Sequence, residues 1–199
     1  MSDLSLEAKA SVEIKSGNRG GSGTVIAAGQ VLTAAHLFPA DSAGMVYVNT
    51  SSPRYRYRAK LVGIDRKSDL ALVEILPKQW GFPEPVKLAE SDPSYGVPVT
   101  RYSYPYFHRE RFPHRTTGTV AGPGVGGTLR LSFPAISGDS GSGVFLATGE
   151  LAGQNPWAEG RAGFALINPV SAIKRFLGRC RRRPETPPPQ PPPSPPSKG

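Results

Sequence analysis

Residues 137–144 read SGDSGSGV, and the interpretation of this stretch decides that of the whole chain. It sets Ser140 between an acid, Asp139, and a glycine. Glycine, serine and aspartate are ordinary turn residues, so a flexible surface turn is one interpretation. The other is a nucleophile held on a tight turn, where small residues let backbone N–H groups approach a substrate carbonyl. The rest of the chain has to decide between them.

The composition is that of a globular protein. The 199 residues suit one compact unit or two small lobes, with 38% hydrophobic and 20% charged residues. No apolar run approaches the roughly 20 residues of a membrane-spanning helix, and the N-terminus lacks the apolar segment of a secretory signal. Cys180 is the only cysteine, so no internal disulfide forms and a reducing compartment is permitted. We therefore expect a protein without a membrane span, located in the cytoplasm.

The end of the chain is basic and rich in proline. Of the net charge of +9, residues 179–199 carry +4, from five basic side chains and one acid. Repeated prolines, as in PPPQPPPSPP, favour the polyproline II conformation and cannot pack a core. We expect residues 179–199 to be a disordered tail, acting either as an inert spacer or as a ligand for a proline-reading module.

Most of the remaining chain shows short strand patterns. Stretches such as GSGTVIAAGQVLTAAH, DLALVEIL and GSGVFLATGELAGQ combine β-branched and apolar residues with closely spaced turns. Many short strands at this spacing are typical of an all-β barrel or sandwich. The Pro- and Gly-containing segment 88–98 is the best link between two lobes, which divides the chain into residues 1–88 and 89–178.

One helix is predicted directly before the tail. In the stretch NPVSAIKRFLG, Asn168 can cap a helix and Pro169 fits its first position. The apolar residues that follow recur at helical spacing, and the pattern ends near Gly178. We expect the apolar face of this helix to pack on the body of the protein.

A nucleophilic Ser140 needs a general base, because a serine hydroxyl is a weak nucleophile at neutral pH. The histidines of the chain are His36, His108 and His114. His36 ends the apolar stretch VLTAAH, whereas the other two stand in YFHRERFPHR, a stretch with no strand behind it to fix their geometry. Taken alone, His36 is also consistent with a structural histidine whose hydrogen bonds are satisfied in the core or at a strand edge.

The base in turn needs an acid to hold its tautomer. Asp69 comes immediately before the buried stretch LALVEI, where a carboxylate can be half buried and point at a neighbour. A turn residue at the start of a strand is the alternative for Asp69. Asp65 is the substitute candidate, although its neighbours Arg66 and Lys67 indicate a solvated turn.

Taken together, the three residues and their contexts resemble the trypsin-like (chymotrypsin-fold) serine proteases. VLTAAH is similar to the histidine motif of that family, SDLALV to its aspartate motif and GDSGSG to its nucleophile motif. The sequence of residues 12–178 looks most like the HtrA-like branch and its small viral and bacterial relatives, although no PDZ sequence follows. The resemblance implies a two-lobed double β-barrel with residues 1–88 in the first barrel and 89–178, including the C-terminal helix, in the second.

The resemblance also implies a site and a reaction. Ser140 would be the nucleophile, His36 the general base and Asp69 the residue that orients the histidine. The turn at Gly138, Asp139 and Ser140 would form the oxyanion hole. Activation by cleavage of the N-terminus is not expected, since no fitting cleavage site is visible. Neither a metal nor an organic cofactor is implied.

The substrate of such an enzyme is a polypeptide. Residues expected to bind it are Pro134, Ala135, Ile136, Gly153, Gln154 and Asn155. None of them is acidic, so we expect an uncharged, apolar or small residue before the cleaved bond. The extended substrate is expected to add a strand near residues 151–155. Polyprotein processing and protein quality control are both compatible roles.

Two other functions compete with this one. Arginine alternates with aromatic residues in RYRYR and RYSYPYFHRERFPHR, and RCRRR follows the helix, so a protease-like module for nucleic acid or capsid assembly is the alternative. Water-facing arginines on an edge strand are the simpler explanation for RYRYR. A serine esterase of the α/β-hydrolase type fits poorly, because no histidine follows Ser140.

Overall fold

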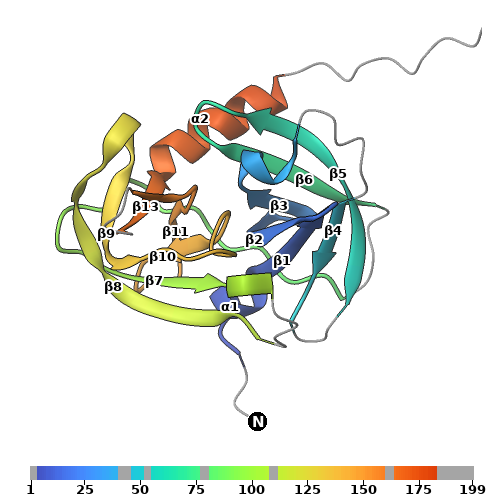
Figure 1. The fold of residues 1–199 in the computed structure, drawn as a ribbon, viewed down its shortest axis with the longest axis horizontal. Helices are drawn as coiled ribbons and strands as arrows, with labels where there is room; N and C mark the ends of the chain where they lie inside the picture. The colour runs from blue at the N-terminus through green and yellow to red at the C-terminus, as the bar shows by residue number, and fades with distance from the viewer. Residues whose placement is uncertain are drawn as a thin grey trace, which may run out of the picture.

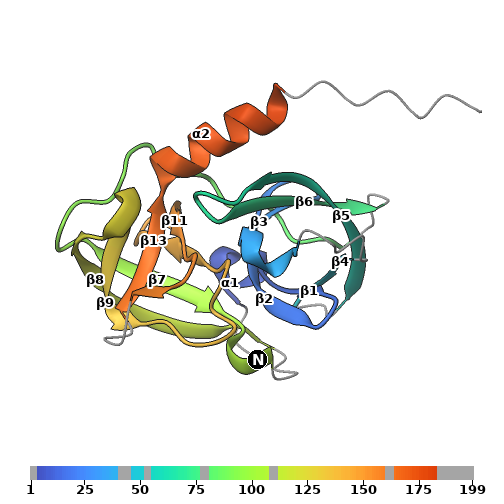
Figure 2. The same ribbon diagram turned by 45° about the horizontal axis from the view of Figure 1, so that its top comes forward.

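The structure, a computed structural model, describes residues 4–39, 46–51, 55–76, 81–107, 112–159 and 164–182. These residues form two antiparallel β-barrels that lie side by side, with a C-terminal helix above them (Figures 1 and 2). The expected all-β double barrel of the chymotrypsin type is therefore confirmed.

The first barrel is built from strands that are all close in sequence. They are β1 (Ser11–Ser16), β2 (Arg19–Ala27), β3 (Gln30–Thr33), β4 (Val46–Asn49), β5 (Arg56–Asp65) and β6 (Leu70–Leu76). They pair in the order β1-β2-β3-β6-β5-β4, and the pairing of β1 with β4 closes the barrel. Apolar residues from alternate strand positions, such as Ile14, Leu32 and Val48, are fully buried inside.

The second barrel draws its strands from a longer stretch of chain. They are β7 (Pro98–Ser103), β8 (His114–Pro123), β9 (Leu129–Pro134), β10 (Gly143–Phe145), β11 (Leu151–Gln154), β12 (Ala158–Glu159) and β13 (Phe164–Pro169). The sheet runs β11-β10-β7-β8-β9-β13-β12, and a further pairing of β11 with β13 closes it into a barrel. A separate apolar cluster, which includes Val99, Leu131 and Ile167, fills this barrel.

The C-terminal helix α2 (Val170–Arg181) ties the second barrel to the first. It buries Ile173, Phe176 and Leu177 in the same apolar cluster as the first barrel. The helix was expected to end near Gly178, but it continues to Arg181, so residues 179–181 are helical and not part of a tail. The extra turn is held because Arg179 pairs with Asp65 and Cys180 packs over Gly63. The Pro-rich tail beyond residue 182 lies outside the described residues.

Another chain segment provides the cap of α2. Asn168, the expected cap, instead donates through its side chain to the Ser68 carbonyl at 2.7 Å and to Gln154 Oε1 at 2.9 Å. Asp92, from the link between the barrels, accepts from the Ser171 backbone N–H at 2.8 Å and from its hydroxyl at 2.7 Å. The expected role of Asn168 is therefore wrong, because its side chain is engaged by other elements.

A shorter helix, α1 (Leu6–Ala10), precedes β1. Among the described residues, no helix is both long and apolar enough to cross a membrane.

Candidate active site

His36 and Asp69 are brought together by the pairing of β3 with β6. The 3-10 helix η1 (Ala35–Leu37), which carries His36, follows directly after β3, and Asp69 directly precedes β6. Since the strands are antiparallel and Thr33 pairs with Ala71, the end of one lies beside the start of the other. Asp69 has φ +52°, an uncommon backbone conformation for a residue other than glycine.

The carboxylate of Asp69 binds His36 at two points. Oδ2 lies 2.7 Å from His36 Nδ1, and Oδ1 accepts the His36 backbone N–H at 2.7 Å. Asp69 is 5% exposed, whereas the His36 side chain is 42% exposed. A carboxylate can only accept, so the proton of the neutral imidazole sits on Nδ1 and Nε2 is left as an acceptor. The pair therefore leaves Nε2 as the acceptor of a partly exposed imidazole.

The turn with Ser140 rests against the same end of the first barrel. The Ser22 N–H on β2 donates to the Ser140 carbonyl oxygen at 2.8 Å. The next residue, Gly141, has φ +87°, and a Cβ there would lie 2.1 Å from the Ser22 oxygen and 2.9 Å from the Ala34 nitrogen. Because Ala34 directly precedes η1, Ser140 lies beside the helix that carries the histidine.

The turn leaves two backbone donors available. The Asp139 N–H donates to the Ile136 carbonyl at 3.1 Å, so it serves the turn itself. Within the described residues, neither the Gly138 N–H nor the Ser140 N–H takes part in a hydrogen bond. Gly138 has φ +98°, and a Cβ there would lie 2.3 Å from the Tyr104 carbonyl oxygen, which explains the glycine. These are the donors that an oxyanion hole would use.

The acid beside Ser140 is neutralised by an arginine from β7. Asp139 Oδ2 lies 2.8 Å from Arg101 Nη2, and the side chains are 1% and 3% exposed. The same guanidinium donates to the Pro134 carbonyl at 3.1 Å and to Asn155 Oδ1 at 3.3 Å. Burial lowers the pKa of Arg101 below its ordinary value, while the charge of Asp139 acts in the opposite direction. Arg101 begins the stretch RYSYPYFHRERFPHR, where it was a candidate contact to nucleic acid; that role is wrong, because the arginine is buried in the pair with Asp139.

A pocket of about 230 Å³ adjoins Ser140. It is lined by Ala135, Ile136, Ser137, Asp139, Ser140, Asn155 and Trp157. Three of the predicted substrate-binding residues, Ala135, Ile136 and Asn155, are therefore gathered beside the serine. Trp157 was not predicted, because a tryptophan after Asn-Pro gives no signal of its own in the sequence.

The other predicted binding residues lie away from the pocket lining. Pro134 binds Arg101 through its carbonyl, and Gly153 and Gln154 are buried in β11. Strand β11 pairs with β10 on one side and with β13 on the other. At Gly153 and Gln154 both edges of the strand are occupied, so a substrate strand cannot add there; addition beside Asn155, which follows β11, stays a prediction.

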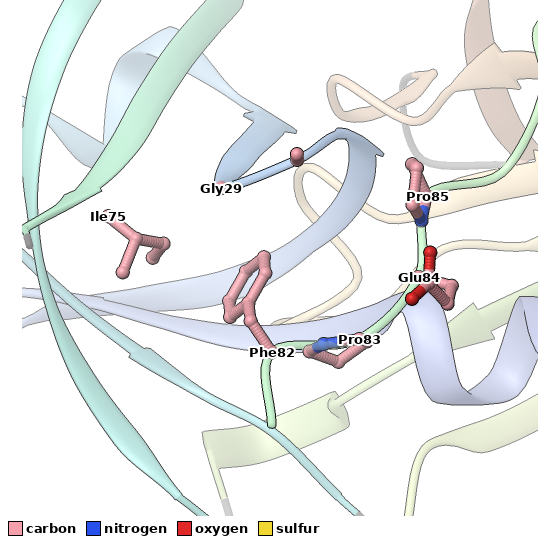
Figure 3. Close-up of a pocket in the computed structure, with 7 residues that line it drawn as sticks. Gly29, Ile75, Phe82, Pro83, Glu84 and Pro85 are labelled. Carbon is pink, nitrogen blue, oxygen red and sulfur yellow. The ribbon is translucent and has the colours of Figure 1, made fainter. Parts of the chain in front are cut away.

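A different hollow, of about 220 Å³, lies at the turn between β2 and β3. Figure 3 shows the ring of Phe82 standing between Ile75 and Gly29, with Pro83, Glu84 and Pro85 along the adjoining segment. Glu84 is its one ionisable side chain, and none of the three predicted catalytic residues lines it. This hollow has no arrangement that suggests chemistry.

The basic and metal-binding possibilities gain nothing from the structure. Tyr57 of RYRYR is 2% exposed and packs against Phe82, so it cannot stack on a base. Strand β5 is paired with β4 and β6, so it is not the expected edge strand, although Arg56 and Arg58 are exposed to water as expected. His108 and the tail lie outside the described residues. Among those that are described, no three His, Cys, Asp or Glu residues gather as metal ligands.

Known structures share this architecture. A serine endoprotease from Yersinia pestis superimposes with a TM-score of 0.77 and 22% identity, over 92% of this chain and 68% of that one. Rv3671c from M. tuberculosis H37Rv, solved as a serine-to-alanine mutant in an inactive form, gives a TM-score of 0.72 and 21% identity over 87% of both chains. At these identities the likeness concerns the fold.

Sequence comparison identifies the family. A search of curated proteins gave no significant match. The family described as "Trypsin-like peptidase domain" matches residues 21–153, which include all three motifs quoted above. The chain therefore belongs to the trypsin-like peptidase family and is a serine endopeptidase with the chymotrypsin-like double barrel.

Proposed function

We propose that the protein hydrolyses peptide bonds through Ser140, His36 and Asp69, by way of an acyl-enzyme. The observation that carries the proposal is the doubly hydrogen-bonded pair of His36 and Asp69, with both distances at 2.7 Å. This pair stands at the barrel end against which the turn of Ser140 rests. An aspartate that fixes the tautomer of a histidine beside a serine is the arrangement that makes a serine nucleophilic.

In the acylation step, Ser140 Oγ attacks the carbonyl carbon of the substrate and transfers its proton to His36 Nε2. The resulting imidazolium is stabilised by Asp69, which stays ionised. Collapse of the tetrahedral intermediate breaks the C–N bond, and His36 gives its proton to the leaving amine. Water then attacks the ester on Ser140 by the same proton transfers, which releases the acid and restores the enzyme.

The negative oxygen of the intermediate needs donors in fixed positions. The N–H groups of Gly138 and Ser140 suit this role, because the turn leaves both available. Removal of one such donor typically slows kcat by about 10²–10³. The N–H of Asp139 is not one of these donors, because it already donates to the Ile136 carbonyl. Asp139 supports the oxyanion hole only through its side chain, which pairs with Arg101.

The substrate class follows from the lining of the pocket beside Ser140. Ala135, Ile136 and Trp157 provide apolar surface, and Asp139 is neutralised by Arg101. We therefore propose cleavage after an uncharged, apolar or small residue. Polyprotein processing and protein quality control both remain compatible with such a specificity.

The proposal is tested by labelling with a fluorophosphonate probe, which reacts with activated serines. The native chain, Ser140→Ala and His36→Ala are compared at equal concentration, with His114→Ala as a matched control because that histidine is exposed on β8. We expect rapid labelling of the native chain and of His114→Ala, and loss of labelling in the other two.

Failure of the folded native chain to react would contradict the proposal. It would favour the alternative of a protease-like binding module, which predicts salt-sensitive binding to nucleic acid. Labelling that persists in Ser140→Ala would show that another residue is the nucleophile.

A further inference from the structure

The N–H groups of an oxyanion hole must be held in place before the substrate arrives. This is demanding here, because Gly138 has φ +98° and glycine has access to many other conformations. A rotation of the Ser137–Gly138 peptide would turn its N–H away and its carbonyl toward the substrate. The hole therefore needs contacts that fix the peptide planes of the turn.

One of these contacts comes from Tyr106. Its backbone N–H donates to the Ser137 carbonyl oxygen at 2.7 Å. In a trans peptide the C=O and the following N–H point in opposite directions. A carbonyl of Ser137 that faces Tyr106 therefore directs the Gly138 N–H to the opposite side.

The next peptide is fixed by Ser22, which belongs to the other barrel. Its Oγ lies 2.8 Å from the Gly138 carbonyl oxygen and 2.8 Å from the Tyr104 backbone nitrogen. The direction of both bonds is unambiguous, because a backbone N–H only donates and a carbonyl only accepts. The hydroxyl thus accepts from Tyr104 and donates to Gly138.

Ser22 holds this turn through both its side chain and its backbone. It is fully buried, its own N–H binds the Ser140 carbonyl at 2.8 Å, and its own carbonyl accepts from Thr33 Oγ1 at 2.7 Å. The side chain and the backbone of one residue in the first barrel therefore hold two carbonyls of the nucleophile turn in the second.

The partner segment carries backbone strain. Tyr106 has φ +57°, which is uncommon for a residue other than glycine, and its side chain is 55% exposed. A strained residue persists only where surrounding contacts hold it. The bond to Ser137 is one such contact, and it needs the N–H of Tyr106 to be turned in this direction.

From these contacts we infer that Ser22 is a positioning residue for the oxyanion hole. Its hydroxyl relays a hydrogen bond from Tyr104 to Gly138 and, together with the Tyr106 N–H, keeps the hole formed in the free enzyme. The inference rests on the proposed role of Ser140. It makes the active geometry a property of contacts within the two barrels.

The test compares an ester with the matching thionoester, in which sulfur replaces the carbonyl oxygen. p-Nitrophenyl acetate and its thiono analogue are suitable probes, because sulfur accepts hydrogen bonds weakly and so gains little from an oxyanion hole. The variant is Ser22→Ala in the full chain. Ser16→Ala is the matched control, since Ser16 is a buried serine of β1 whose hydroxyl has no hydrogen-bond partner among the described residues.

We expect Ser22→Ala to acylate with the ester about 10–100-fold more slowly, below the loss of a complete donor. The rate with the thionoester should change much less, and Ser16→Ala should match the native chain with both. Equal rates for Ser22→Ala and the native chain, or equal losses with both probes, would overturn the inference.

A second variant guards against misfolding of the first. An ester in place of the amide at residue 106, made with the hydroxy-acid analogue of tyrosine, removes the donor to Ser137 and keeps the side chain. It should show the same selective loss. A native chain that acylates no faster than Ser140→Ala would overturn the proposed function, a result distinct from a native chain that is active and insensitive to Ser22→Ala.

Discussion

Each barrel contributes one buried aspartate to the site, Asp69 and Asp139, and the two carboxylates have different partners. Asp69 is 5% exposed and faces an imidazole that reaches solvent, whereas Asp139 is 1% exposed and faces a guanidinium that is as buried as itself. The distances from Asp69 Oδ2 to His36 Nδ1 and from Asp139 Oδ2 to Arg101 Nη2 are both short, at 2.7 and 2.8 Å. The distances alone therefore do not distinguish the two pairs.

The partners make the difference. In the proposed mechanism the imidazole gains and loses a proton, so the pair of Asp69 would change its charge in each cycle. A guanidinium stays charged at any working pH, so the pair of Asp139 is permanent. The first carboxylate is suited to support a proton transfer, and the second to fix the shape of a turn. Substitutions should separate these functions, with activity lost at one site and stability at the other.

The largest effect is expected for Asp69→Asn. The amide can donate to His36 Nδ1, which would leave the proton on Nε2 and the histidine unable to act as a base. We expect kcat to fall by about 10⁴. Hydrolysis of an ester substrate measures the activity, and thermal unfolding measures the stability. Loss of less than tenfold in kcat would show that Asp69 does not set the tautomer.

Asp139→Asn should act mainly on stability. It leaves Arg101 charged and buried without its counter-charge, and breaking a buried ion pair typically costs about 3–5 kcal/mol. Urea unfolding measures the loss. Arg101→Met combined with Asp139→Asn removes both charges and should be more stable than Asp139→Asn alone. A double variant that is no more stable than Asp139→Asn would contradict this explanation.

Gly138→Ala tests the backbone that the Asp139 pair supports. The new Cβ would lie 2.3 Å from the Tyr104 carbonyl oxygen, so the turn must shift and the hole should be lost. We expect kcat to fall by about 10²–10³. Gly29→Ala is the control, because Gly29 has φ +73° and nothing within 4 Å of a new Cβ. It should cost about 1–2 kcal/mol of stability and leave kcat unchanged.

The smallest effect is expected on the outer surface of the first barrel. Lys60 and Glu74 form an ion pair at 3.1 Å, with side chains 53% and 37% exposed. Because solvent screens such pairs, Lys60→Ala should change the free energy of unfolding by less than about 1 kcal/mol. A loss as large as that of Asp139→Asn would mean that burial is not what separates the pairs.

The sequence was sufficient for the fold class and for the neighbourhood of the site. His36 and Asp69 could be placed because each adjoins an apolar strand, and the structure brings them together. The residue type of Arg101 gave no indication of its buried ion pair, since its partner Asp139 is distant in the chain. A signal did exist, because Val99, Arg101 and Ser103 alternate along β7 and share its buried face.

Contacts between the barrels could not be predicted. Ser22 stands in the stretch GSGTVIAAGQVLTAAH, whose pattern predicts strands but no partner for this hydroxyl, and its partners Tyr104 and Gly138 are far along the chain. The helix cap shows the same limit, since local pattern indicated Asn168 and the structure uses Asp92. Local sequence specifies strands and turns, whereas these bonds depend on how the barrels meet.

The order in which the strands close has a consequence for synthesis on the ribosome. Every strand of the first barrel lies within residues 11–76, so this barrel can close while the rest of the chain is still being made. The second barrel closes only when β13, at residues 164–169, pairs with β9 and β11. The pair of His36 and Asp69 is thus assembled early and the turn of Ser140 late, so under the proposed mechanism we expect an incomplete chain to lack a working active site with which to cut itself or its neighbours.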